Sequence, residues 1–389
     1  MIRRSTVFWL GVSQLVSWGI TYYLIGGFAE TIGADLHWSR DIVYGGFSGA
    51  LLVMALVSPI AGRMIDRHGG GPVMVTGSVL NALGCIGLAT CHGLVQYFVT
   101  WACLGVSMRL TLYDAAFAAL ARIGGPEARR PISQITLLGG LASTVFWPLG
   151  NLLAEHFGWR GALLCYAGFA LATIPMHLAI PSGSYADRQP EEKKTHPAPR
   201  AASQGDIFLA GSLYALMTAT TNFLNAGMSA HMIGILSGLG LASATAVWIA
   251  TLRGVGQSSA RLGEVLFGRR IEPLTLNVLA SFLLPVCFMA GLFSGVSGPA
   301  ALAFALIYGA GNGVITIVRG TLPLVLFDHR SYGAFVGRLL APSFLLSATA
   351  PLAYAAIIER FGPTAALDMS LVLAMATLAA AIILKRKFS

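Results

Sequence analysis

"PSGSYADRQPEEKKTHPAPRAASQGD" (residues 181–206) is a long polar stretch near the middle of an otherwise strongly apolar chain. Proline, serine and charged residues dominate it, and a segment of this composition behaves as a flexible tether. On both sides of it, the sequence consists of long apolar runs separated by short loops. The stretch therefore predicts two halves, residues 1–180 and 207–389, joined by a cytoplasmic linker at 181–206.

The apolar runs indicate membrane spans. Of the 389 residues, 56% are hydrophobic and only 11% are charged, whereas a soluble domain carries about 25% charged residues. Each run is long enough to cross a hydrocarbon core roughly 30 Å thick. We expect an all-α membrane protein with twelve transmembrane helices in two pseudo-symmetric six-helix bundles. The expected spans are residues 6–28, 42–61, 72–91, 95–120, 132–154, 161–180, 207–229, 241–260, 273–292, 299–327, 334–357 and 364–384.

The distribution of basic residues predicts the orientation. With the N-terminus inside, the outer segments would hold only Arg40, Arg160 and Arg360, and the other Lys and Arg outside the spans would face the cytoplasm. Cytoplasmic loops of membrane proteins carry such an excess. The net charge of +9 is thus interpreted as an orientation signal and not as a nucleic-acid-binding surface. We expect a monomer in the cytoplasmic (inner) membrane, with both termini in the cytoplasm.

Two pairs of segments indicate an internal repeat. "EHFGWRGAL" (155–163) aligns with "ERFGPTAAL" (359–367) at an offset of 204 residues, and "RMID" (63–66) aligns with "RLGE" (261–264) at 198. The offsets are similar enough for one duplication with small changes in loop length. Transporters are commonly built from such repeats, with the binding site between them near the middle of the membrane.

A loop motif resembles a known family. In "GRMIDRHGGG" (62–71), Gly62, Asp66, Arg67 and Gly69 fit the loop signature of the major facilitator superfamily, and "FGWR" (157–160) resembles another frequent sequence of that family. The resemblance implies two six-helix bundles around a central cavity lined by spans 1, 4, 7 and 10, which opens alternately to each side. The first span, with "WG" at 18–19 and "YY" at 22–23, resembles that of monocarboxylate carriers in the family.

The resemblance also implies a gate at the cytoplasmic side. The loop after the second span would contact the facing bundle and hold the inward side shut, with Glu264 as the counterpart of Asp66. A purely topological role of the basic residues remains the alternative. The expected gating-loop residues are Gly62, Asp66, Arg67, Gly69, Arg261 and Glu264.

Polar residues recur at helical spacing in spans 1, 7 and 10. Such a stripe faces protein or water, because lipid cannot satisfy its hydrogen bonds. These side chains either join neighbouring helices through hydrogen bonds or line a pathway, and their presence on the spans implied to form the cavity favours a pathway. The predicted pathway residues are Gln14, Trp18, Thr21, Arg109, Tyr113, Tyr214, Asn222, Asn225, Asn312 and Arg319.

Charged residues inside the spans are rare and point to function. Arg109 and Asp114 are five residues apart, which is about 140° around a regular helix, so they are not expected to pair. We expect Asp114 to face Arg319 across the bundle interface, either as a static ion pair or as the proton-coupling carboxylate, because protonation of a carboxylate responds to burial and to a nearby arginine. Together with Arg253, these arginines give a positive surplus that favours an anionic solute, unless Arg253 snorkels to the cytoplasm.

These patterns predict a secondary transporter of a small, anionic organic solute that works by alternating access, with protons as a candidate coupling ion. The alternative in the same class is an efflux transporter of a toxic small molecule or metalloid. An intramembrane enzyme or a receptor is a different class, but the sequence contains neither an HExxH motif nor the GxxxxGK[ST] motif of an ATP-driven pump.

The scattered cysteines have no metal-ligand spacing, so we expect no metal and no cofactor. The expected partners are the substrate and the lipid bilayer.

Overall fold

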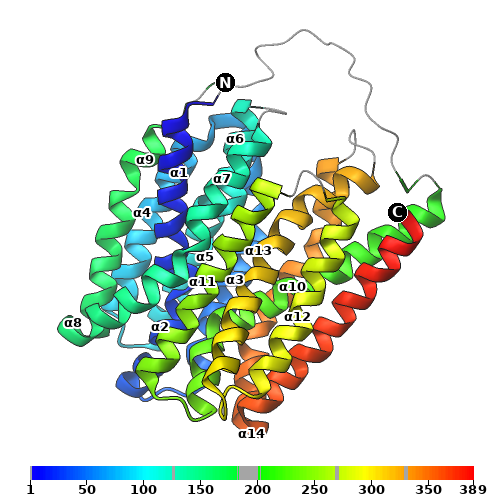
Figure 1. Cartoon of the computed structure of the whole chain (residues 1–389). Helices are drawn as coiled ribbons and strands as arrows, with labels where there is room; N and C mark the ends of the chain where they lie inside the picture. The colour runs from blue at the N-terminus through cyan, green and yellow to red at the C-terminus, as the bar shows by residue number, and fades with distance from the viewer. Residues whose placement is uncertain are drawn as a thin grey trace. The chain divides into compact units, whose positions relative to one another are not determined.

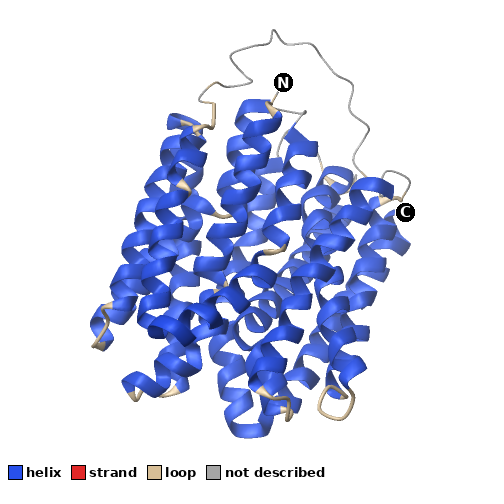
Figure 2. Cartoon of the chain, turned by 60° about the vertical axis from the view of Figure 1, so that its left-hand side comes forward, coloured by secondary structure: helices blue, strands red, loops and turns tan. Residues whose placement is uncertain are grey.

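The protein is described by a computed structural model that covers residues 2–124, 128–181, 183, 200, 201, 203–267, 271–327 and 332–389. All regular structure in these ranges is helical (Figure 2). The chain divides into two compact units, Met1–Glu192 and Lys193–Ser389. In Figure 1 the first unit runs from blue to green and the second from green to red. The predicted linker at 181–206 lies for the most part outside the described residues.

The first unit contains ten helical elements in its described part, and several expected spans are split among them. The first span comprises α1, a π-helical turn η1 and α2, and the fourth span comprises α5 and α6. The elements are α1 (Arg4–Ser17), η1 (Trp18–Tyr22), α2 (Leu24–Leu36), α3 (Arg40–His68), α4 (Gly70–Ala89), α5 (Leu94–Thr111), α6 (Tyr113–Gly124), α7 (Arg129–Gly140), α8 (Ala142–Ala172) and α9 (Ile174–Leu178).

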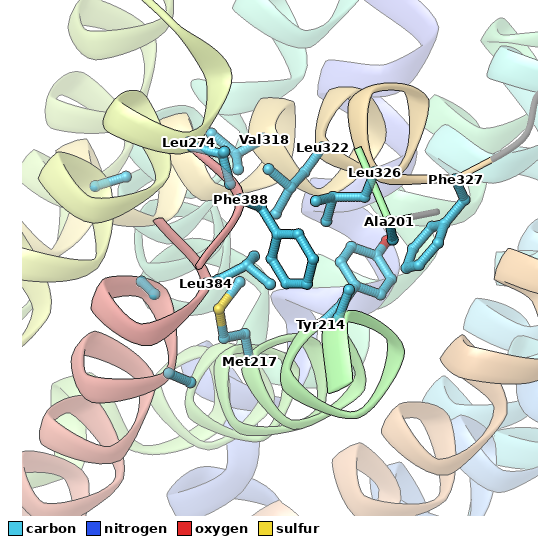
Figure 3. Packing of buried hydrophobic residues seen from close by; sticks show 14 of the residues in the cluster. Ala201, Tyr214, Met217, Leu274, Val318, Leu322, Leu326, Phe327, Leu384 and Phe388 are labelled. Carbon is cyan, nitrogen blue, oxygen red and sulfur yellow. The ribbon is translucent and has the colours of Figure 1, made fainter. Parts of the chain in front are cut away.

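The second unit contains fewer and longer helices in the residues that the structure describes. They are α10 (Gln204–Gly238), α11 (Ser243–Phe267), α12 (Pro273–Leu292), α13 (Gly298–Leu326) and α14 (Tyr332–Phe388). Helix α10 packs on α14, and α13 packs on both α11 and α12. Aromatic and aliphatic side chains from α10, α12, α13 and α14 meet in one buried cluster, which includes Tyr214, Met217, Leu322 and Phe388 (Figure 3).

The helices confirm the fold class expected from the sequence. Eight helical stretches among the described residues are long and apolar enough to cross a membrane. Two of them, Arg130–Leu178 and Ser343–Phe388, each contain a bend and hold two expected spans. The eight stretches thus account for ten of the expected spans, and the first expected span and α11 account for the other two. The protein is therefore an all-α integral membrane protein.

The bends in α8 and α14 lie at equivalent positions of the internal repeat. Gly158 has φ 68° and ψ 167°, and Gly362 has φ 83° and ψ 171°. The two glycines occupy the same place in the aligned segments "EHFGWRGAL" and "ERFGPTAAL". Glycine adopts a positive φ without steric cost. The repeated sequence therefore encodes a repeated turn between consecutive spans.

Gly158→Ala is expected to destabilise the protein by about 1–3 kcal/mol, because a positive φ combined with ψ near 180° is a backbone conformation that is essentially restricted to glycine. No atom lies within 4 Å of a Cβ built on Gly158, so the cost is conformational and not steric. Thermal unfolding of the purified protein in detergent measures it. Gly168→Ala is the matched control, since Gly168 lies within helix α8 and is equally open; equal effects of the two changes would contradict this explanation.

The expected loop position of the gating residues is wrong. Helix α3 continues past residue 61 to His68, so Gly62, Asp66 and Arg67 are helical and only Gly69 lies outside, with φ 87°. Arg67 and His68 are basic residues in the last turn, where they interact favourably with the helix dipole, and the positive φ of Gly69 ends the helix. Arg261 and Glu264 likewise lie within α11 and not in a loop.

Glycines allow α11 and α13 to pack backbone against backbone. A Cβ on Gly309 would overlap the carbonyl oxygen of Arg253, and a Cβ on Gly313 would approach the carbonyl oxygen of Gln257 to 2.6 Å. Small residues at such interfaces let membrane helices approach closely. In the first unit, Gly105, which lies 204 residues before Gly309, packs in the same way on the backbone of Ala50 in α3. The close approach fixes the part of α11 that carries Arg253.

Candidate functional site

The fourth span is interrupted at Leu112. This residue has φ −77° and ψ −175°, an extended conformation that separates α5 from α6. In a regular helix the Thr111 carbonyl would accept a hydrogen bond from the Ala115 amide, four residues later. Here the Ala115 amide instead donates to the carbonyl of Leu112 at 3.0 Å. The interruption thus leaves the Thr111 carbonyl in need of another donor.

Gln14 of α1 supplies that donor. Its Nε2 donates to the Thr111 carbonyl at 2.7 Å, and both residues are completely buried. The Thr111 hydroxyl accepts from Asn81 Nδ2 of α4 at 3.3 Å, and Asn81 in turn accepts from Ser107 of α5. Buried polar groups in a membrane protein must be satisfied internally. Gln14, predicted as a pathway residue, therefore supports the interruption from inside the first unit.

The interruption brings Arg109 and Asp114 together as an ion pair, with 15% of the Arg109 side chain and 40% of the Asp114 side chain exposed. The expectation that these residues do not pair is therefore wrong. It assumed a regular helix, and the extended Leu112 changes the angle between their side chains. The predicted contact of Asp114 with Arg319 would join the two units, and it stays a prediction.

A second interruption, in the first span, contacts the first. The turn η1 begins at Trp18, whose ring lies 5.0 Å from that of Tyr113, the first residue of α6, and 4.9 Å from that of Tyr22. Thr21, also in η1, is completely buried and donates to the carbonyl of Ser17 at 2.6 Å. π-helical turns occur frequently at functional sites.

The two interruptions depart from the internal repeat. Helices α10 and α13 run without a break through the positions 204 residues after η1 and Leu112. The irregular backbone is therefore confined to the region that holds the Trp18–Tyr113 contact and the Arg109–Asp114 ion pair. We call this place the interrupted site.

A buried arginine occupies the second unit. Arg253 of α11 is completely buried, its Nη2 donates to Asn225 Oδ1 of α10 at 2.6 Å, and its guanidinium lies 5.0 Å from the ring centroid of Tyr308. Asn312 of α13 donates to the same Asn225 oxygen at 3.0 Å. Asn225 and Asn312, both predicted as pathway residues, thus form a hydrogen bond with each other. The alternative that Arg253 snorkels to the membrane surface is wrong, because neighbouring helices enclose it.

A second arginine, Arg319 of α13, is held in the same way by Asn222, which lies one turn before Asn225 on α10. Its Nη1 donates to Asn222 Oδ1 at 2.7 Å, and Asn222 Nδ2 donates to the Ser343 hydroxyl of α14 at 3.1 Å. Tyr214 donates its hydroxyl proton to the backbone carbonyl of Arg319 at 2.8 Å. The asparagine partners are neutral, so these hydrogen bonds orient the guanidinium groups without cancelling their charge.

The gating residues Arg67 and Arg261 belong to different units, and each is described within its own unit. Arg261 is completely buried, and its Nε donates to the carbonyl of Gly313 at 3.4 Å, so it links α11 to α13 within the second unit. Arg67 is exposed at the end of α3, and the side chain of Asp66 lies outside the described residues. The gate therefore stays a prediction.

Several residues of these sites were not singled out from the sequence. Asn81 and Ser107 were visible as polar residues within apolar runs, and a stripe search in spans 3 and 4 could have found them. By contrast, spacing alone places Tyr308 on the polar face of span 10 with Asn312 and Arg319, but its contact with Arg253 depends on helix packing. No group of His, Cys, Asp or Glu in the described part of the chain could hold a metal ion.

Comparisons with known proteins identify relatives. A profile described as Major Facilitator Superfamily matches residues 10–341. The chain is 24% identical to monocarboxylate transporter 4 of Rattus norvegicus over 327 residues, which are 78% of this chain and 66% of that protein. It is 23% identical to monocarboxylate transporter 13 of Bos taurus, over 82% of this chain and 72% of that protein. The chain thus spans just under two thirds of the length of the first of these relatives.

A solved structure shares the fold. The crystal structure of the nucleoside transporter NupG superposes with a TM-score of 0.73 over 99% of each chain, at 12% sequence identity. At this identity the likeness concerns the fold alone.

Proposed function

The chain belongs to the Major Facilitator Superfamily, and on that premise we propose that it is a secondary transporter of a small organic anion, driven by protons and working by alternating access. The relatives named above are monocarboxylate transporters, which favours a small carboxylate as the solute. Transport, and not catalysis, is the activity that this family membership supports.

The observation that carries the choice of an anion is the burial of Arg253. A guanidinium in the membrane interior is costly, and such residues mark substrate or ion pathways. Asn225 orients it by a hydrogen bond that leaves the positive charge in place. Arg319 adds a second guanidinium, held in the same way by Asn222. A carboxylate matches the planar guanidinium, which binds it through two parallel hydrogen bonds.

Proton coupling is assigned to Asp114. The carboxylate is half-buried and paired with Arg109, and this pair lies at the interruption of the fourth span. Protonation would remove the charge that holds the pair together. The charge state of Asp114 and the geometry of the interrupted site are therefore linked, which is the property that a coupling group requires.

We also propose the orientation of the chain and a gate at one end. The distribution of Lys and Arg favours cytoplasmic termini in the cytoplasmic membrane. The end of α3, with Asp66 and Arg67, would then face the cytoplasm and form the inward gate. The Trp18, Tyr113, Asn222 and Asn312 side chains are assigned to the solute pathway. Trp18 contacts Tyr113, Asn312 donates to Asn225, and Asn222 accepts from Arg319.

Uptake of radiolabelled solutes into proteoliposomes tests the proposal. With the outside acidic, a short-chain monocarboxylate is expected to accumulate, and its uncharged amide is not. Arg253→Gln is expected to weaken binding of the carboxylate about 10-fold or more, because a hydrogen bond to a charged group contributes roughly 1.5–3 kcal/mol, while Arg253→Lys retains part of the affinity. Equal uptake of acid and amide, or unchanged affinity in Arg253→Gln, would refute the anion assignment.

A further inference from the structure

A small, partly open cavity lies in the second unit, where α10, α12, α13 and α14 come together. Its volume is about 20 Å³, and polar side chains of all four helices line it, among them Thr221, Asn277, Ser281, Arg319 and Thr377. About 10–15 Å³ is enough for one water molecule, and cavities with polar walls hold water whereas apolar ones stay dry. The size and lining of the cavity therefore match a single water molecule.

Ser281 gives independent support. Its side chain is 1% exposed, and its hydroxyl has no hydrogen-bond partner among the described residues. Asn277 lies one turn earlier on α12, is 2% exposed, and donates Nδ2 to the sulfur of Met217 at 3.7 Å, a weak contact. A buried polar group without a partner costs about 1–3 kcal/mol. A ligand that both donates and accepts hydrogen bonds would satisfy these side chains.

Arg319 forms part of the cavity wall. Its hydrogen-bond partner Asn222 is neutral, and the structure gives no ion pair for Arg319 within the described residues. Placing a charge in an apolar interior is costly unless polar groups or water solvate it. Chloride would neutralise Arg319 more fully, but chloride only accepts hydrogen bonds, whereas water both donates and accepts them.

We propose that this cavity is a binding site for one structural water molecule, held by Ser281 and Asn277, that hydrates Arg319 from inside the second unit. The water completes the solvation of the Arg319 guanidinium, which also donates a hydrogen bond to Asn222. Because Ser281 and Asn277 lie on α12 and Arg319 lies on α13, the water links these two helices. This inference concerns the interior of one unit, and it holds whichever solute the protein moves.

X-ray radiolysis with mass spectrometry tests the site in the full-length protein, because hydroxyl radicals formed from a bound water oxidise the side chains beside it. Met217 lines the cavity and is only 6% exposed. We expect its oxidation to be several-fold faster than that of Met74, which is completely buried in the hydrophobic cluster of the first unit. Oxidation of Met217 no faster than that of Met74 would overturn the proposal.

A variant that fills the cavity provides the second measurement. Ser281→Val replaces the hydroxyl by two methyl groups, so Met217 oxidation is expected to fall to the level of Met74. Ser294→Val is the matched control, because Ser294 is 2% exposed, its hydroxyl also has no partner in the described part of the chain, and it is absent from the cavity wall. Unchanged Met217 oxidation in a folded Ser281→Val protein would also refute the site. Should that variant fail to fold, the comparison of Met217 with Met74 in the unaltered protein decides alone.

Discussion

Asp114→Asn is expected to abolish accumulation of the solute under a pH gradient while leaving exchange of labelled for unlabelled solute intact. Asparagine has nearly the same shape as aspartate and still accepts a hydrogen bond from Arg109, but it takes up no proton. The variant therefore loses the charge and the titratable group of Asp114 while keeping the size of the side chain, so the interrupted site no longer responds to pH. Uptake into proteoliposomes, with and without an imposed pH gradient, separates the two activities.

Asp35→Asn is the matched control for this experiment. Asp35 also pairs with an arginine, Arg160, at 3.1 Å, but both residues lie in segments expected at the outer surface. This change is expected to leave gradient-driven uptake at the level of the unaltered protein. Accumulation that persists in Asp114→Asn would remove Asp114 from the coupling role and leave the Arg109–Asp114 pair as a structural contact.

Gly309→Ala is expected to cause a large loss of stability, about 1–3 kcal/mol or more, because overpacking a tight interface forces the backbone apart. The added methyl group would meet the carbonyl oxygen of Arg253, a backbone atom that cannot rotate away. Helix α11 must then move away from α13, and Arg253 moves with it. We therefore expect weaker carboxylate binding as well as a lower unfolding temperature, measured by fluorescence-detected gel filtration after heating.

Gly298→Ala serves as the control for that substitution. Gly298 begins the same helix, and no atom lies within 4 Å of a Cβ built there. This change is expected to shift the unfolding temperature little and to leave binding unaffected. If the two variants unfold at the same temperature, close backbone contact is not what holds α11 against α13.

The sequence predicted the fold well because hydropathy depends on composition over about 20 residues. The twelve expected spans all coincide with helical segments, and the aligned glycines Gly158 and Gly362 both form the turns between spans. Helix ends were less well predicted, since α3 and α11 continue beyond their apolar segments to His68 and Phe267. Polar residues outside the hydrocarbon core can remain helical, so hydropathy does not define where a helix ends.

The site was predicted only in part, because its geometry depends on contacts between distant residues. The interruption at Leu112 is supported by Gln14, which is 97 residues away from Thr111 in the sequence, and helical spacing carries no information about such a partner. The pairing of Arg109 with Asp114 was missed for this reason. The asparagine stripe of α10 was found from spacing alone, whereas its arginine partners depend on how α10, α11 and α13 pack.

The Thr111 carbonyl in the fourth span can accept a hydrogen bond from either of two donors, the side chain of Gln14 or the amide of Ala115. If the Ala115 amide took over as donor, the span would straighten, and the number of hydrogen bonds to Thr111 would not change. A straight span would turn Arg109 and Asp114 about 140° away from each other and separate their charges. We therefore expect the backbone at Leu112 to act as a joint, with the bent form favoured by an ionised Asp114 and the straight form favoured by a neutral one.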